Sequence, residues 1–293
     1  MADKTRIDPE VLRLFDGYVH GNLSRRDFLD RVAAFTASSV TAAALLNALS
    51  PNYALAQQVD PQDESISVSY KKYASPRGAG VMQGYFARPA VAGHKLPAVV
   101  VIHENRGLNP YIEDVARRLA VAGYIAFAPD ALTPLGGYPG NDDDGRELQR
   151  QRDGAEMVED FVAATEFLMQ HPDCTGRTGA VGFCFGGAMA MRLAVRLPGL
   201  GAAVAFYGRH PDPSEAAAIQ APLMLHHAGL DERVNASWPA FEKALVAAGA
   251  DYVNHEYPDV NHGFHNDTTP RYDKDAADLA WRRTLAFFAD RLG

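Results

Sequence analysis

Residues 178–196 read TGAVGFCFGGAMAMRLAVR, and they carry the clearest indication of the fold class. Its first part is short and apolar, as expected of a strand that is buried on both faces. Its second part, from about Cys184 to Arg196, has the spacing of a helix. A strand that turns directly into a helix through a glycine-rich turn is typical of a β/α unit with parallel strands. The sequence therefore predicts the α/β class.

The same alternation continues on both sides of this stretch. Strands are expected at 65–74, 84–88, 96–103, 124–129, 202–207, 222–227 and 252–257. Helices are expected at 111–122, 148–170, 236–248 and 273–291. These elements predict a mostly parallel sheet flanked by helices, and such sheets bind ligands beyond the carboxyl ends of their strands. The polar stretch 130–147 is interpreted as an exposed loop or a cap over the site, and its aspartate run 142–144 as solvated charge.

Cys184 occupies the tight turn between strand and helix. Glycines two positions before and after it, Gly182 and Gly186, leave room for the neighbouring backbone. The start of a helix stabilises a thiolate, and the backbone N–H of Phe185 is placed to face a developing oxyanion. The alternative is a buried structural cysteine, but the strand before it and the helix after it favour a nucleophile.

A candidate acid and a candidate base follow later strands. Asp231 comes after the strand at 222–227, and His262 comes after the strand at 252–257. The order cysteine, aspartate, histidine is that of a catalytic triad, in which the histidine takes the proton of the nucleophile and the aspartate orients the ring. Asp259 is a rival acid but is less well placed for a turn at a strand end.

Glu104 ends the apolar strand at 96–103. A carboxylate beside a cysteine nucleophile is unexpected in a plain esterase, because it opposes a thiolate electrostatically. The pair His103-Glu104 does not extend to the His-Glu-x-x-His signature of zinc proteases, since position 107 is glycine. The sequence indicates neither a metal site nor a cofactor.

These motifs resemble those of the dienelactone hydrolase family, the carboxymethylenebutenolidase group of α/β-hydrolases. The resemblance covers about residues 65–293 and rests on Glu104, the turn at 182–187, Gly229-Leu230-Asp231 and His262-Gly263-Phe264. It implies the α/β-hydrolase fold and the catalytic set Cys184, His262, Asp231 and Glu104, with the N–H groups of Phe185 and Asn105 binding the oxyanion. In such enzymes the glutamate holds the resting thiol and swings away when an anionic substrate arrives.

The resemblance implies a hydrolase that cleaves a small ester or lactone through a thioester acyl-enzyme. Two alternatives stay open: a thioesterase or peptidase on the same site, and a non-catalytic binding or assembly protein on the same fold. Family members that act on dienelactone bind the substrate carboxylate with arginines, one of them four residues beyond the histidine, where this chain has Asn266. Substitutes for substrate binding are Arg106, Tyr138, Tyr207 and Arg271, with Arg209, Arg146, Arg150 and Arg152 as further arginines.

The first sixty residues lie outside this pattern and are treated as a separate segment, 1–60, before the hydrolase domain at 61–293. This segment resembles a twin-arginine export signal. It has the arginine pair Arg25 and Arg26, an uncharged run from 32 to 59 and the small-residue motif Ala-Leu-Ala at 54–56. Alternatively, amphipathic spacing within 9–20 and after Ser24 predicts two helices of an arm that docks on the body or on a second subunit as a homodimer. The second interpretation is slightly favoured and implies a cytoplasmic protein, whereas the first implies a periplasmic one.

Composition narrows the class of protein. The chain has 293 residues, of which 47% are hydrophobic and 22% charged, within the range of globular proteins and long enough for one or two domains. A net charge of −8 offers no phosphate-binding surface, which argues against nucleic-acid binding. The N-terminal run is too polar for a stable membrane span. Two cysteines, Cys174 and Cys184, are too few for a disulfide framework.

Overall fold

The computed structural model describes residues 7–35 and 41–293. The chain divides into two compact units. One comprises Met1–Asn52 with Thr268–Pro270, and the other comprises Tyr53–Asp267 with Arg271–Gly293. Residues 36–40, which belong to the uncharged run after the twin arginine, lie outside the described residues, as do residues 1–6.

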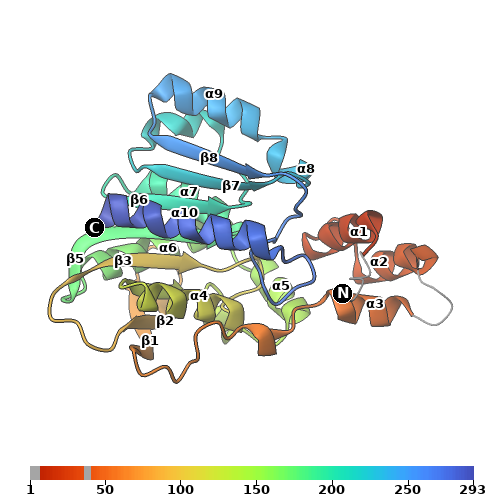
Figure 1. Cartoon of the computed structure of the whole chain (residues 1–293), viewed down its shortest axis with the longest axis horizontal. Coiled ribbons are helices and arrows are strands. Elements are labelled where there is room, and N and C mark those ends of the chain that lie inside the picture. The colour runs from red at the N-terminus through yellow and green to blue at the C-terminus, as the bar shows by residue number, and fades with distance from the viewer. Residues whose placement is uncertain (1–6, 36–40) are drawn as a thin grey trace. The chain divides into compact units, whose positions relative to one another are not determined.

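The N-terminal unit is helical, with α1 (Pro9–Val19), α2 (Arg25–Val32), the 3₁₀ turn η1 (Ala33–Phe35) and α3 (Ala42–Leu49) (Figure 1). Ser24 caps α2, and Asp27 completes a reciprocal capping box, so the twin arginine forms the first turn of a capped helix. The apolar faces of these helices bury a small core of their own, centred on Phe15, Phe28 and Leu49. The expected N-terminal helical extension is present, and the export signal stays a prediction.

An eight-stranded sheet forms the centre of the larger unit. Its strands are β1 (Ile66–Ser75), β2 (Gly80–Pro89), β3 (Leu96–Ile102), β4 (Ile125–Pro129), β5 (Cys174–Phe183), β6 (Ala202–Phe206), β7 (Leu223–Ala228) and β8 (Tyr252–Tyr257). They lie in the order β1-β2-β4-β3-β5-β6-β7-β8. Strand β2 runs antiparallel to both neighbours, and the pairs from β4 to β8 are parallel. The predicted mostly parallel sheet is therefore confirmed.

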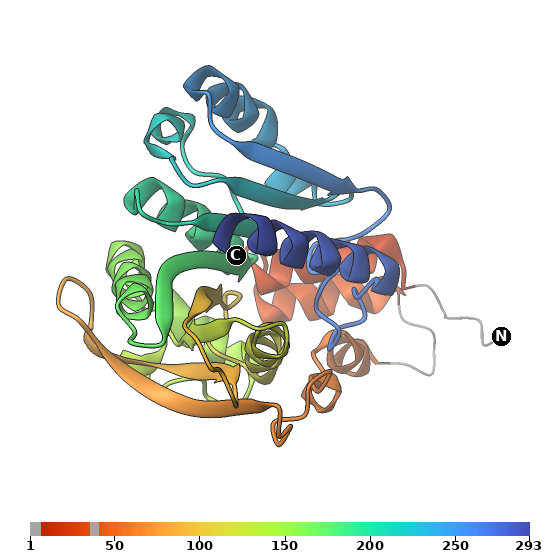
Figure 2. The ribbon, with the colours of Figure 1, turned by 60° about the vertical axis from the view of Figure 1, so that its left-hand side comes forward.

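Helices cover both faces of this sheet (Figures 1 and 2). On one face, α4 (Pro110–Val121) and α10 (Lys274–Leu292) bury a core that includes Val99 and Val101 of β3. On the other face, α6 (Gly154–Met169), α7 (Phe185–Arg196) and α9 (Trp238–Ala248) bury a core that includes Val100 and Ile102. Successive residues of β3 thus enter opposite cores, which explains why this strand is apolar throughout.

The expectation of an exposed loop at 130–147 is wrong in its second half. A 3₁₀ turn, η3 (Thr133–Leu135), is followed by helix α5 (Asp142–Arg150), which Asn141 caps by accepting from the Asp144 N–H at 2.9 Å. The side chain of Asp142 is 9% exposed and ion-paired, so the aspartate run is not simply solvated charge. Within the described residues, none of the helices has the length and apolar character needed to span a membrane.

Candidate active site

Cys184 lies between β5 and α7 with φ 57° and ψ −112°, a strained conformation for a residue other than glycine. Its N–H donates to the Phe206 carbonyl at 3.0 Å, which ties the turn to β6. A Cβ on Gly182 would lie 1.9 Å from the Gly186 oxygen, and one on Gly186 would lie 2.2 Å from the Ile102 oxygen. The two glycines are therefore required by close backbone approach, as the sequence indicated.

Asp231 and His262 meet at the ends of β7 and β8. Asp231 caps the short helix α8 (Glu232–Asn235): its Oδ1 accepts from the Val234 N–H at 3.2 Å, which orients the carboxylate. Its Oδ2 then accepts from Nδ1 of His262 at 2.5 Å. The backbone N–H of Leu230 donates to the Val260 carbonyl at 3.1 Å and holds the two loops together.

His262 also faces the cysteine, with a ring nitrogen within 4.8 Å of the Cys184 Sγ. Burial, the largest single influence, lowers the pKa of His262. The charges of Cys184 and Asp231 and the hydrogen bonds to both outweigh it and raise that pKa from 6.5 to about 10. The same influences favour a protonated ring between the cysteine sulfur and the aspartate carboxylate.

Glu104 and Cys184 follow two strands, β3 and β5, that are paired in parallel. Ile102 is opposite Gly182, so Glu104 and Cys184 each follow two residues later on adjacent strand ends. The Oε2 atom of Glu104 accepts hydrogen bonds from Nη2 of Arg106 at 2.7 Å and from Nδ2 of Asn266 at 3.0 Å. In this structure, therefore, the carboxylate is bound by an arginine and an amide.

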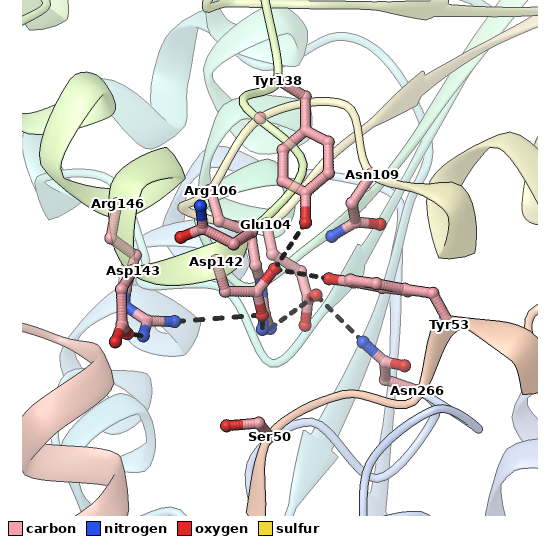
Figure 3. Close-up of polar contacts among 12 residues, drawn as sticks. Ser50, Tyr53, Glu104, Arg106, Asn109, Tyr138, Asp142, Asp143, Arg146 and Asn266 are labelled. Carbon is pink, nitrogen blue, oxygen red and sulfur yellow. Dashed lines mark hydrogen bonds and ion pairs between the residues drawn. The ribbon is translucent and has the colours of Figure 1, made fainter. Parts of the chain in front are cut away.

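Arg106 lies between two carboxylates (Figure 3). Its Nη1 is 2.5 Å from Oδ2 of Asp142, the first residue of α5. Burial alone would lower the pKa of Arg106, but the charges of Asp142 and Glu104 hold it well above its usual value. Oδ1 of Asp142 accepts in turn from the hydroxyls of Tyr53 at 2.6 Å and Tyr138 at 3.1 Å. The predicted substrate contacts Arg106 and Tyr138 are therefore engaged within the protein.

The remaining predicted residues differ in their distance from Cys184, Asp231 and His262. The centroid of the Tyr207 ring lies 4.9 Å from the centroid of the His262 ring. The backbone of Tyr207 has a positive φ of 38°. The Arg271 guanidinium carbon lies 3.3 Å from where a Cβ on Gly263 would be, directly after His262 in the chain. Phe185 is the first residue of α7, so its N–H has no carbonyl partner within the helix. Asn105 directly follows Glu104 in the chain.

Sequence reasoning missed the roles of Asp142 and Tyr53. Asn141 followed by three acidic residues is a signal for the start of a helix and could have indicated that Asp142 belongs to an ordered element. Tyr53 lies 89 residues before its partner Asp142, and no local pattern reveals such a contact. Asn266 was noted as a replacement for arginine, but its hydrogen bond to Glu104 was not predicted.

The chain is similar in sequence to known proteins. Residues 82–292 match the model of the dienelactone hydrolase family, and residues 1–36 match a family described as YqhI-like. A protein of Saccharolobus solfataricus whose name places it among the carboxymethylenebutenolidases is 32% identical over 228 residues, covering 65% of this chain and 88% of that protein. The fragment YghX of Escherichia coli K12, named as a hydrolase, is 63% identical over 114 residues, covering 39% of this chain and 97% of the fragment.

Solved structures also resemble the chain. One is a protein of Klebsiella pneumoniae subsp. pneumoniae whose name places it among the dienelactone hydrolases. It has 28% sequence identity and a TM-score of 0.67, and the match covers 76% of this chain and 99% of that one.

Proposed function

Because this chain belongs to the dienelactone hydrolase family and is an ester or lactone hydrolase of that type, we propose that Cys184, His262 and Asp231 are its catalytic triad. The observation that carries the proposal is the 2.5 Å contact between His262 and Asp231, with the cysteine sulfur close to the same ring. The strained turn at Cys184 supports a nucleophile, since such strain persists at functional sites.

The reaction then has two stages, formation of a thioester on Cys184 and its hydrolysis by water. The Cys184 thiolate attacks the ester carbonyl, and the N–H groups of Phe185 and Asn105 stabilise the oxyanion. Collapse of this intermediate forms a thioester and breaks the ester C–O bond, while His262 gives its proton to the leaving oxygen. Water attacks the thioester as His262 removes a proton from it, and the acid is released with the thiolate restored.

The test is a Cys184→Ala variant assayed on small p-nitrophenyl esters. We expect turnover to fall by about three orders of magnitude or more, since removal of a nucleophile has effects of that size. Cys174, buried at the start of β5, provides a matched Cys174→Ala control that keeps normal turnover. Unchanged hydrolysis by the Cys184→Ala variant would refute the triad.

Two finer points stay predictions. The preference for an anionic substrate is tested by comparing the rate of hydrolysis of the monoester of a dicarboxylic acid with that of its uncharged diester. Arg106 is already paired with two carboxylates, so a preference for the monoester would direct attention to Arg271 beside the catalytic histidine. Formation of a homodimer through the N-terminal segment is tested by sedimentation equilibrium of the full chain.

A further inference from the structure

A carboxylate beside a nucleophilic cysteine competes for the thiol proton. Glu104 and Cys184 lie at equivalent positions on adjacent strand ends, so Glu104 is placed to take part in this competition. If Glu104 were unbound, it would oppose a thiolate by its like charge or accept a hydrogen bond from the thiol, and both effects keep the sulfur protonated. What Glu104 binds in the resting protein therefore decides where the proton of Cys184 goes.

We propose that Arg106, anchored by Asp142, holds Glu104 so that in the free enzyme the thiol proton of Cys184 passes to His262 without substrate. Arg106 and Asp142 are thus positioning residues for Glu104. This inference rests on the proposed role of Cys184 as nucleophile. It differs from the behaviour implied by the resemblance, in which the glutamate holds the resting thiol until substrate arrives.

The contacts of Glu104 are the first support. The same oxygen, Oε2, accepts from both Arg106 and Asn266, and the residue is 1% exposed. Releasing it would leave the buried guanidinium of Arg106 without one of its two charged partners, which is unfavourable. The contact is therefore expected to persist in the resting protein.

The anchoring of Arg106 is the second support (Figure 3). Its side chain is 4% exposed and meets Asp142 on the side away from Glu104. Asp142 is fixed by the hydroxyls of Tyr53 and Tyr138 and by its place at the start of α5. Tyr53 and Tyr138 thus hold the carboxylate that pairs with the guanidinium of Arg106, which restricts the movement of both groups.

The alternative proton acceptor is the third support. His262 is oriented by Asp231 and lies close to the sulfur, and its raised pKa agrees with a ring that keeps the proton. Because Arg106 compensates the negative charge of Glu104, the electrostatic interaction of the sulfur with the imidazolium dominates. The sulfur is then nucleophilic before any ligand binds.

The experiment measures alkylation of the free enzyme by iodoacetamide as a function of pH, with the modified cysteine assigned by peptide mass spectrometry. We expect Cys184 of the unmodified chain to react rapidly down to about pH 6, because a thiolate paired with an imidazolium stays ionised there. In Arg106→Gln, we expect the acid limb of the rate profile to move up by at least about one pH unit, so that the rate measured on that limb falls by about tenfold or more. In the double variant Arg106→Gln/Glu104→Gln, the rate should recover, since the competing carboxylate is gone.

Controls separate this effect from loss of a buried ion pair. Arg117 is a matched arginine, 3% exposed and paired with Asp114 at 3.2 Å, and Arg117→Gln should leave the alkylation profile unchanged. Asp142→Asn serves as a second variant if Arg106→Gln does not fold, and should slow alkylation in the same direction. An unchanged profile in the Arg106 or Asp142 variant, or no recovery in the double variant, overturns the proposal. The ester assay of Cys184→Ala decides the triad separately, so the two proposals can fail independently.

Discussion

The charge state of His262 depends on Asp231, and Asp231→Asn tests this dependence. The pKa of His262 is raised from 6.5 to about 10, and these 3.5 units correspond to about 5 kcal/mol in favour of the imidazolium at 1.36 kcal/mol per unit. The charges of Cys184 and Asp231 supply this preference against the cost of burial. Because Asp231 is negative, its removal must lower the pKa of the ring.

An opposite charge at this distance typically moves a pKa by about 1–3 units, so we expect a fall of that size in Asp231→Asn. The protonated ring is the acid that serves the leaving oxygen, so activity in the unmodified chain should decline only as the pH approaches about 10. In the variant this alkaline limb should move down by about 1–3 pH units, and kcat should fall by about 10²–10⁴ because the ring tautomer is no longer fixed.

The assay is the pH dependence of kcat/KM on a p-nitrophenyl ester whose background hydrolysis is subtracted at each pH. Circular dichroism at the same pH values checks that the variant is folded. Asp259→Asn is the matched control, because Asp259 is exposed, lies near His262 in the chain and is the rival acid. An alkaline limb that stays in place in Asp231→Asn, or that moves equally in Asp259→Asn, would refute the assignment.

Two further predictions concern stability and are measured by urea unfolding. Gly182→Ala should destabilise the protein by about 1–3 kcal/mol or more, since the new Cβ would lie 1.9 Å from a backbone oxygen. Gly154→Ala, where nothing lies within 4 Å, should be neutral or slightly stabilising. Asp114→Ala should cost about 3–5 kcal/mol because it leaves two buried arginines without their shared carboxylate. Asp278 forms an exposed ion pair with Lys274, so Asp278→Ala should lower the free energy of unfolding by less than about 1 kcal/mol. Equal effects within either pair would contradict these predictions.

The sheet and the turn at Cys184 were predictable because their signals are local. The run at 96–103 is apolar at every position, as a strand covered on both faces must be, and β3 occupies Leu96–Ile102. The glycines around Cys184 are fixed by backbone contacts within one strand-to-helix turn and its neighbouring strand. Asp231 and His262 follow β7 and β8, and because these parallel strands are neighbours in the sheet, residues after them lie close together.

Helix α5 was missed because its sequence resembles a loop. Glycines and aspartates dominate 136–145, and Gly145 lies inside the helix, where glycine is normally unfavourable. The structure explains this glycine: a Cβ there would lie 2.4 Å from the Arg106 carbonyl oxygen. Close packing of α5 on the segment after β3 therefore overrides helix propensity at this position, and it brings Asp142 to Arg106.

The charges around Glu104 could not be predicted, because their partners are distant in sequence. Asn266 lies 162 residues from Glu104, and Asp142 lies 36 residues from Arg106. Each of these side chains is unremarkable in its local setting, and their effect arises only when three parts of the chain meet. A motif identifies Glu104 as present beside the nucleophile, but its partners decide whether it competes for the thiol proton. If Arg106 holds Glu104 as proposed, the motif rests here with an ionised sulfur, whereas the family resemblance implies a thiol that stays protonated until substrate binds.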